Sequence, residues 1–333
     1  MFELSFIWAG IIAFSVLTYV ILDGFDLGIG ILFPFAKSER DKATMMNSIA
    51  PIWDGNETWL VMGGGGLFAV FPLAYAVIMP ALYMPIILML LALIFRGVAF
   101  EYRWRTVRWK PVWDAAFFGG SLVAAFMQGI ALGALVQGIE VAGRAYAGGW
   151  WDWLSVFSIL TGFAVIVGYA LLGTTWIILK TEGDLQRQMQ GYARWLAVGT
   201  LGFIGIVSVL TPFQDAVYFQ RWFNLPGSVL SVLMPGAVMV AAWALFSGLN
   251  AGKDGQPFFA ALGLFVLCFI GIGISFYPNI VPPNLTIAAA AAPDESLWFA
   301  LVGTLVLVPM ILVYTGYTYW IFRGKIDPDE GYH

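Results

Sequence analysis

Four carboxylic acids lie where the surface of a water-soluble protein would not put them. Asp23 and Asp26 belong to the segment LDGFDLGIG, and Asp54 and Glu57 belong to the segment PIWDGNETWL. Each pair is spaced i, i+3, so in a helix both members share one face. An ionised carboxylate in hydrocarbon is unfavourable, so such groups must be buried in protein or neutralised. Buried carboxylates can take up and release protons near neutral pH, which makes these four a predicted proton path.

The same acids also have a structural interpretation. Asp54 and Glu57 follow Pro51, a residue that favours the first turn of a helix, and acids there complement the positive end of the helix dipole. For Asp23 and Asp54 the sequence favours proton uptake from the cytoplasm. For Asp26 and Glu57 both interpretations stay open.

The remainder of the chain has the composition of a membrane protein. Of its 333 residues, 60% are hydrophobic and 11% are charged, whereas soluble domains carry about 25% charge. Run 58–95 is divided at Phe71, and run 255–293 ends in a proline-rich loop. We predict an all-α integral membrane protein with about nine transmembrane helices in a single domain, 1–333, because a span needs about 20 apolar residues. The charge-free runs are 4–22, 58–95, 115–139, 153–179, 195–214, 222–252, 255–293 and 296–322.

The positive charges indicate the orientation. When the connections are assigned alternately to two sides, 14 of the 16 lysines and arginines fall on the side opposite the N-terminus. Cytoplasmic connections are enriched in Lys and Arg, so we predict the N-terminus outside and the C-terminus in the cytoplasm. Asp23 then lies about 28 Å from Leu4 along the first helix, near the cytoplasmic side.

Two further charged residues are predicted at the same depth. The second span runs outward from Asp54 and Glu57, and the third returns and ends in FRGVAFEYR, which contains Arg96 and Glu101. Three helices would therefore bring carboxylates and an arginine to one side of the membrane. We predict that Arg96 and Glu101 form structural ion pairs there.

Several kinds of chemistry are excluded by residue counts. The single histidine is His333, the single cysteine is Cys268, and no GxGxxG or P-loop motif is present. Haem in membrane proteins is usually held by His or by His with Met, so we predict no metal ligand and no catalytic residue in this chain, and a partner must carry any redox metals. The small net charge of −4 argues against a nucleic-acid partner. Gln128 and Gln137 are expected to hydrogen bond across helices.

Several segments together resemble subunit II of the cytochrome bd quinol oxidases. The motifs are LDGFDLGIG (22–30), NSIAPIWDGNETWL (47–60), FRGVAFEYR (95–103), YPNIVPPNLTI (277–287) and LVPMILVYTGYTYWIF (307–322). The resemblance covers nearly the whole chain. Its compact length is similar to that of the cyanide-insensitive branch of the family.

This resemblance implies a bacterial terminal oxidase of the cytoplasmic (inner) membrane. Such a complex oxidises quinol, reduces O₂ to water and takes protons from the cytoplasm. Its subunit I binds the quinol and carries two haems b and one haem d, or haem b in its place, whereas subunit II binds no haem by itself. The resemblance also allows a small single-helix subunit and a structural ubiquinone.

The resemblance also implies roles for individual residues. Asp23 and Asp54 match acidic positions of the family's proton path. Trp53 falls in a stretch linked to a bound quinone in some members. The other matching motif positions are Asp26, Glu57, Arg96 and Glu101.

One segment departs from the family pattern, and two other functions stay open. Relatives commonly carry an aromatic–acidic pair after LTI, whereas this chain has Ala288 and Ala289, so a site built on that pair is not expected here. The alternatives are a proton-coupled secondary transporter and a structural membrane scaffold. A transporter would favour ionisable residues at the membrane midplane and an internal repeat, and neither is evident in the sequence.

Overall fold

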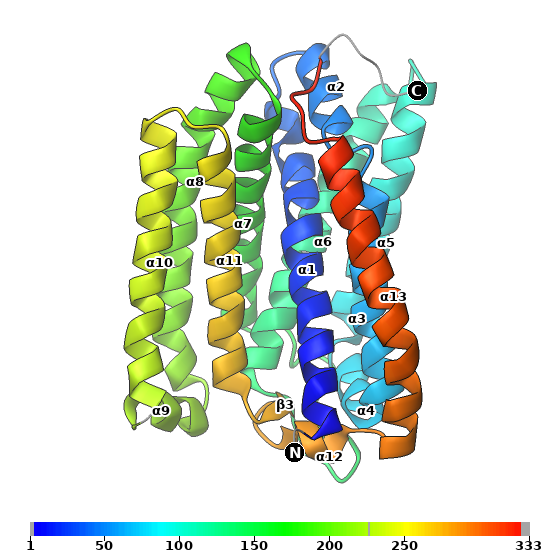
Figure 1. The fold of residues 1–333 in the computed structure, drawn as a ribbon, viewed down its shortest axis with the longest axis vertical. Helices are drawn as coiled ribbons and strands as arrows, with labels where there is room; N and C mark the ends of the chain where they lie inside the picture. The colour runs from blue at the N-terminus through cyan, green and yellow to red at the C-terminus, as the bar shows by residue number, and fades with distance from the viewer. Residues whose placement is uncertain (1–2, 226, 328–333) are drawn as a thin grey trace.

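In the computed structural model, which describes residues 3–225 and 227–327, the chain is built almost entirely of helices (Figure 1), which confirms the all-α prediction. Within those residues, eight helices are long and apolar enough to cross a membrane. They are α1 (Leu4–Leu32), α5 (Tyr83–Tyr102), α6 (Lys110–Gln137), α7 (Val156–Lys180), α8 (Gly183–Leu210), α10 (Gly227–Asn250), α11 (Gly255–Phe276) and α13 (Asp294–Ile321).

Nine spans were predicted from the sequence, and the one not among these eight is the second in chain order, which corresponds to α3 (Trp53–Val70). This helix of 18 residues packs along α1, but it is not one of the eight apolar helices. Its first turns carry Asp54, Asn56 and Glu57, and because the helix has only 18 residues it contains no stretch as apolar as those of the eight. At 1.5 Å per residue it is about 27 Å long, close to the thickness of the bilayer core.

Short elements connect the long helices. Ile139 N–H donates to Pro282 O at 3.0 Å, which joins two small antiparallel hairpins, and Val141 lies opposite Tyr146 in the first of them. The short helices and turns are η1 (Phe33–Phe35), α2 (Glu39–Asn47), α4 (Pro72–Ala81), η2 (Arg103–Arg105), η3 (Thr211–Phe213), α9 (Ala216–Phe223) and α12 (Ile287–Ala290). The strands are β1 (Val141–Ala142), β2 (Ala145–Tyr146), β3 (Asn279–Val281) and β4 (Leu285–Thr286).

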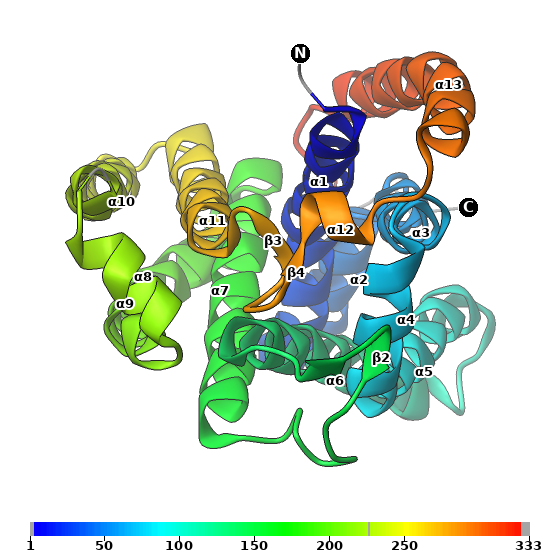
Figure 2. The same ribbon diagram turned by 90° about the horizontal axis from the view of Figure 1, so that it is seen from below.

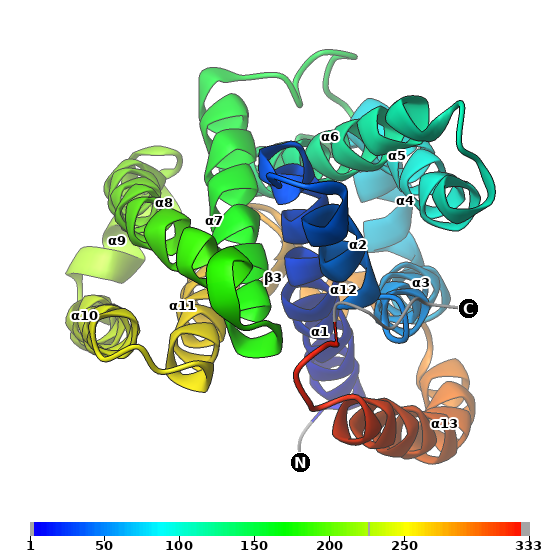
Figure 3. The ribbon, with the colours of Figure 1, turned by 90° about the horizontal axis from the view of Figure 1, so that it is seen from above.

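The long helices run roughly side by side around α1 and α7. Seen along the bundle, α8, α10 and α11 lie on one side of α7, and α1, α3, α5 and α13 lie on the other (Figures 2 and 3). Helix α1 contacts α3, α6, α7, α11 and α13. The candidate carboxylates of α1 are therefore surrounded by protein on most sides.

The connections divide between the two ends of the bundle as the alternation of spans requires. Helix α2 and the turns that follow α5, α7 and α10 lie at one end, at the top of Figure 1, where α13 also finishes. We call this the basic end. Helices α4, α9 and α12 lie at the opposite end (Figure 1). The assignment of the basic end to the cytoplasm stays a prediction.

Glycines allow α1 and α7 to approach each other closely. A Cβ atom on Gly28 would overlap the backbone oxygen of Tyr169, and one on Gly173 would lie 2.5 Å from the backbone carbon of Gly28. Side chains of any size would push the two helices apart. The glycines of the segment LDGFDLGIG therefore place the backbone near Asp23 and Asp26 against α7.

Candidate functional site

Arg96 on α5 lies among three carboxylates that come from two other helices. Its Nη2 atom is 3.3 Å from Asp23 Oδ1 and 3.7 Å from Asp26 Oδ2, and its Nη1 atom donates to Glu57 Oε1. We call these four residues the Arg96 cluster. The structure thus brings together four of the residues singled out in the sequence.

Local features of three helices build this cluster. Asp23 and Asp26 lie one turn apart on the uninterrupted helix α1, and Glu57 lies in the second turn of α3. A Cβ atom on Gly120 of α6 would lie 3.0 Å from the backbone nitrogen of Arg96, so α6 covers the arginine closely. The arginine can therefore reach the carboxylates but not solvent.

Charge and burial differ sharply within the Arg96 cluster. The side chains of Arg96 and Asp26 are 0% exposed and that of Asp23 is 1% exposed, whereas that of Glu57 is 27% exposed. Three carboxylates face one guanidinium, so a fully ionised cluster would hold two uncompensated negative charges in a region of low dielectric. That state is costly. The arrangement therefore favours keeping a proton within the cluster.

A hydrogen-bonded chain that the sequence did not reveal reaches Asp26 from α13. Asn56 Nδ2 donates to Asp26 Oδ2 at 2.8 Å, and the Tyr319 hydroxyl donates to Asn56 Oδ1 at 2.9 Å. Asn56 stands between Asp54 and Glu57 in the sequence, so its place in a polar first turn was a usable signal. Nothing in the sequence pairs it with Tyr319, which is 263 residues away.

A second chain reaches Asp23 from the other side. The Tyr169 hydroxyl donates to Gln128 Oε1 at 2.6 Å, and Gln128 Nε2 donates to the Tyr19 oxygen at 2.8 Å. Tyr19 in turn lies next to Asp23, one helical turn before it. The expectation that Gln128 bonds across helices is confirmed, because it links α6 to α1 and α7.

The expectation for Gln137 is also confirmed. Its Oε1 atom accepts a hydrogen bond of 2.5 Å from Ser155 Oγ, the residue that caps α7.

Trp53 covers one side of the Arg96 cluster. The centre of its ring is 5.4 Å from Arg96 Cζ, within range of a cation–π contact, and 5.2 Å from the ring of Phe100. The side chain is half-buried. Trp53 therefore stands between the buried arginine and the outside of the bundle, at the position where the sequence predicts a quinone contact.

The structure places Asp54 and Glu101 outside the Arg96 cluster. Asp54 is exposed in the first turn of α3, close enough to Glu57 for their charges to repel. Glu101 is exposed on α5, and no ion pair is found for it among the described residues. It follows Arg96 by five residues, about 140° around the helix at 100° per residue, so it faces away from the cluster.

A separate network of ion pairs at the basic end was not anticipated from the sequence. Buried Arg103 donates to Asp114 at 2.5 Å and to Glu39 at 2.9 Å. Lys42 pairs with Asp114 at 2.7 Å and Lys110 with Glu39 at 3.0 Å. Hydrogen bonding from Lys110, with Lys42 and Arg103 nearby, lowers the pKa of Glu39 to about 2. These contacts fasten α2 to the start of α6.

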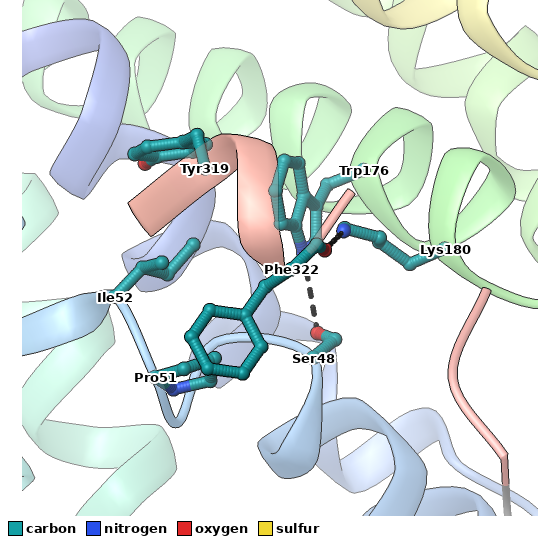
Figure 4. A pocket seen from close by; sticks show the side chains of 7 residues that line it. All are labelled: Ser48, Pro51, Ile52, Trp176, Lys180, Tyr319 and Phe322. Atoms are coloured by element: carbon teal, nitrogen blue, oxygen red, sulfur yellow. Dashed lines mark hydrogen bonds between the residues drawn. The ribbon is translucent and has the colours of Figure 1, made fainter. Parts of the chain in front are cut away.

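The end of α13 is also fastened at the basic end. Lys180 on α7 donates to the backbone oxygen of Phe322, and Lys325 donates to the backbone oxygen of Thr181 at 2.9 Å. Asp254 pairs with Lys325 at 2.7 Å. We call these contacts the C-terminal clasp. Beneath it lies a cavity of about 10 Å³, enough for roughly one water molecule (Figure 4). Its lining residues are Ser48, Pro51, Ile52, Trp176, Lys180, Tyr319 and Phe322.

Comparison with known proteins decides the family. The model of the family described as "Cytochrome bd terminal oxidase subunit II" matches residues 4–322. The chain belongs to this family. The cytochrome bd ubiquinol oxidase subunit 2 of Bacillus subtilis is 32% identical over 347 residues, covering 99% of each chain. The cytochrome bd-I ubiquinol oxidase subunit 2 of Escherichia coli is 30% identical over 364 residues, covering 98% of this chain and 96% of its own.

A solved structure shows the same fold. The bd oxidase from Geobacillus thermodenitrificans contains a chain that superposes with a TM-score of 0.79 at 16% sequence identity, covering 96% of this chain and 98% of that one. Its described residues contain eight helices long and apolar enough to cross a membrane, so this member of the subunit II family is a multi-pass protein of the inner membrane.

The described residues do not fit a haem. They include no histidine, and no group of three His, Cys, Asp or Glu side chains among them is placed to hold a metal ion. Cys268 is the single cysteine and lies within α11. The family name implies haem in the assembled oxidase, and this part of subunit II does not supply its usual ligands.

Proposed function

We propose that this chain is the haem-free subunit of a bd-type quinol oxidase in a bacterial cytoplasmic membrane, acting as one membrane domain over 1–333. In this proposal it supplies protons from the cytoplasm to a haem-bearing subunit I and stabilises that partner. The observation that carries the proposal is the buried Arg96 cluster, in a chain whose relatives are named as subunits of ubiquinol oxidases.

The order of burial supports a direction for proton movement. Asp54 is exposed at the start of α3, Glu57 is partly exposed one turn further, and Asp23 and Asp26 are buried. Protons would pass from Asp54 to Glu57, beside the buried aspartates and Arg96. Carboxylates exchange protons rapidly only over short distances. In this proposal a water molecule therefore bridges the carboxylates of Asp54 and Glu57.

The redox chemistry is assigned to the partner. Subunit I would bind the quinol and two haems b together with a haem d or a third haem b, since the described residues of this chain lack histidine. A structural ubiquinone beside Trp53, a small single-helix subunit and membership in the cyanide-insensitive branch stay predictions.

The position of the Arg96 cluster favours an oxidase subunit over a transporter. Its residues lie on uninterrupted stretches of α1, α3 and α5. Transporters instead place their ionisable residues near the midplane on broken helices. A scaffold role would not require three carboxylates around a single arginine.

The test is turnover of the purified two-subunit complex. Asp23→Asn and Asp54→Asn should each reduce quinol-driven O₂ consumption about tenfold or more, while the haem absorbance is retained. Glu295→Gln, at the opposite end of the bundle, is the matched control and should leave turnover unchanged. Full turnover in both aspartate variants would refute the proton path, and isolation of the chain without a haem-bearing partner would refute the oxidase assignment.

A further inference from the structure

The amide of Asn56 is held in one orientation. Its Oδ1 atom accepts from the Tyr319 hydroxyl at 2.9 Å, and its Nδ2 atom donates both to Asp26 Oδ2 at 2.8 Å and to the Leu22 backbone oxygen at 3.5 Å. The backbone oxygen can only accept, and together with the Tyr319 hydroxyl on the other side it holds the NH₂ group in this position. Asp26 therefore always faces a donor.

This orientation suits an ionised Asp26. A proton on its Oδ2 atom would point at the Asn56 NH₂ group and at Arg96. Its Oδ1 atom is buried, and none of the described residues donates a hydrogen bond to it. Besides Asn56, the polar groups that interact with Asp26 are Asp23 on α1, Glu57 on α3, Arg96 on α5 and Tyr319 on α13.

Packing and the C-terminal clasp hold Tyr319 where its hydroxyl can donate to Asn56. On α13, Tyr314, Tyr317 and Trp320 are exposed, whereas Tyr319 faces inward and contacts the ring of Trp176 at 6.2 Å. Figure 4 shows its ring beside Trp176 and near Phe322, whose backbone oxygen accepts from Lys180. The C-terminal clasp thus holds the end of α13 where the Tyr319 hydroxyl reaches Asn56.

Asp23 has donors as neighbours as well. Arg96 lies 3.3 Å from its Oδ1 atom, and Tyr19 lies beside it at the end of the chain from Tyr169 and Gln128. Of the three carboxylates, only Glu57 combines a contact with Arg96 and a partly exposed side chain, 27% of it accessible. Its charged neighbours are Arg96, Asp23, Asp26 and Asp54.

We propose that Tyr319 and Asn56 are positioning residues that keep Asp26 ionised beside Arg96, so that Glu57 carries the proton that the Arg96 cluster exchanges. This inference rests on the proposed proton path and adds which of its carboxylates changes protonation. It also gives α13, the last span, a part in the site.

The first test is the pH profile of quinol-driven O₂ consumption by the assembled oxidase. Asn56→Ala removes a donor to Asp26, which favours the protonated form, so the limb of the profile set by the cluster should move to higher pH by about one unit. Tyr319→Phe keeps the aromatic ring but removes the hydroxyl that holds the Asn56 amide. The same limb of the pH profile should therefore move to higher pH by about half a unit. Tyr317→Phe on the exposed face of α13 is the matched control.

The second test identifies the exchanging group. Infrared difference spectra between low and high pH should contain the band of a protonated carboxyl group that Glu57→Gln removes and Asp26→Asn leaves in place. The reverse result, with the band lost only in Asp26→Asn, would overturn the proposal. So would an unshifted pH profile in Tyr319→Phe, which decides the matter if Asn56→Ala fails to assemble.

These outcomes separate this inference from the proposed function. If Asp23→Asn and Asp54→Asn lose turnover while Tyr319→Phe keeps the wild-type profile, the proton path stands and the positioning role is wrong. If both aspartate variants keep full turnover, the proton path itself is wrong.

Discussion

The guanidinium Nη2 atom of Arg96 lies 3.3 Å from Oδ1 of Asp23, and both side chains are buried. Removing one partner of a buried ion pair leaves the other uncompensated, which typically costs about 3–5 kcal/mol. Here the arginine compensates three carboxylates at once, so its loss leaves more buried charge uncompensated than the loss of any single acid does. That asymmetry leads to the first prediction.

Arg96→Met should destabilise the protein by about 3–5 kcal/mol, because the carboxylates near it lose their only cation in the cluster. The measurement is the midpoint of thermal unfolding of the complex in detergent. Adding Asp26→Asn should restore part of the loss, since it removes one uncompensated charge. A double variant less stable than Arg96→Met would contradict this account.

Gly28→Ala should weaken the packing of α1 on α7. The new methyl group would overlap the backbone oxygen of Tyr169, and overpacking of this kind typically costs about 1–3 kcal/mol. Gly10→Ala on the same helix is the control, because no atom lies within 4 Å of its added Cβ. Thermal unfolding of both variants checks the prediction, and equal midpoints would show that the close approach is not required.

Glu39 should make the free energy of unfolding depend on pH in the acid range. Hydrogen bonding from Lys110 and Lys42 lowers its pKa from 4.5 to about 2, so the unfolded chain binds a proton at higher pH than the folded one does. The stabilisation is present above pH 4.5 and is lost as the pH falls towards 2. Glu39 is 57% exposed, so the effect should stay below about 1 kcal/mol.

Acid unfolding of wild type and Glu39→Gln measures this contribution. The two should differ in stability at pH 6 and converge near pH 2, whereas Glu182→Gln, an exposed acid at the start of α8, should follow wild type throughout. A difference that grows towards low pH would have the wrong sign.

Lys325→Met should loosen the C-terminal clasp. The variant loses donors to the backbone oxygens of Ile178 and Thr181 and the ion pair with Asp254. Because these groups are partly exposed, a global loss below about 1 kcal/mol is expected, with faster hydrogen exchange confined to the end of α13 and its neighbours on α7. Lys37→Met, an exposed lysine at the same end, should leave exchange unchanged.

Much of the fold could be predicted because membrane helices follow from uninterrupted apolar length. The alternation of connections placed Asp23, Glu57 and Arg96 at one depth, and the structure does bring those three together. Depth in the membrane does not give the direction in which a side chain points, as Glu101 shows. Five residues after Arg96 it has turned about 140° around the helix, which the spacing already implied.

The partners of Asp26 were harder to predict. Asn56 was visible as a polar residue in the first turn of α3, but its hydrogen bond to Tyr319 depends on how α13 docks, and no local pattern encodes that. The network of Arg103, Asp114 and Glu39 was missed for the same reason, since its members come from three separate segments.

The bond between Tyr319 and Asn56 has a consequence for how the protein is made. Chains are synthesised from the N-terminus, so α1 and α3 are available for insertion long before α13. Asp26 therefore spends that interval with Asn56 free to turn, and the site near the start of the chain reaches its final form only when the last helix has entered the membrane. A nascent chain that stops short of Tyr319 has all three carboxylates and the arginine, yet holds them in an unfinished arrangement.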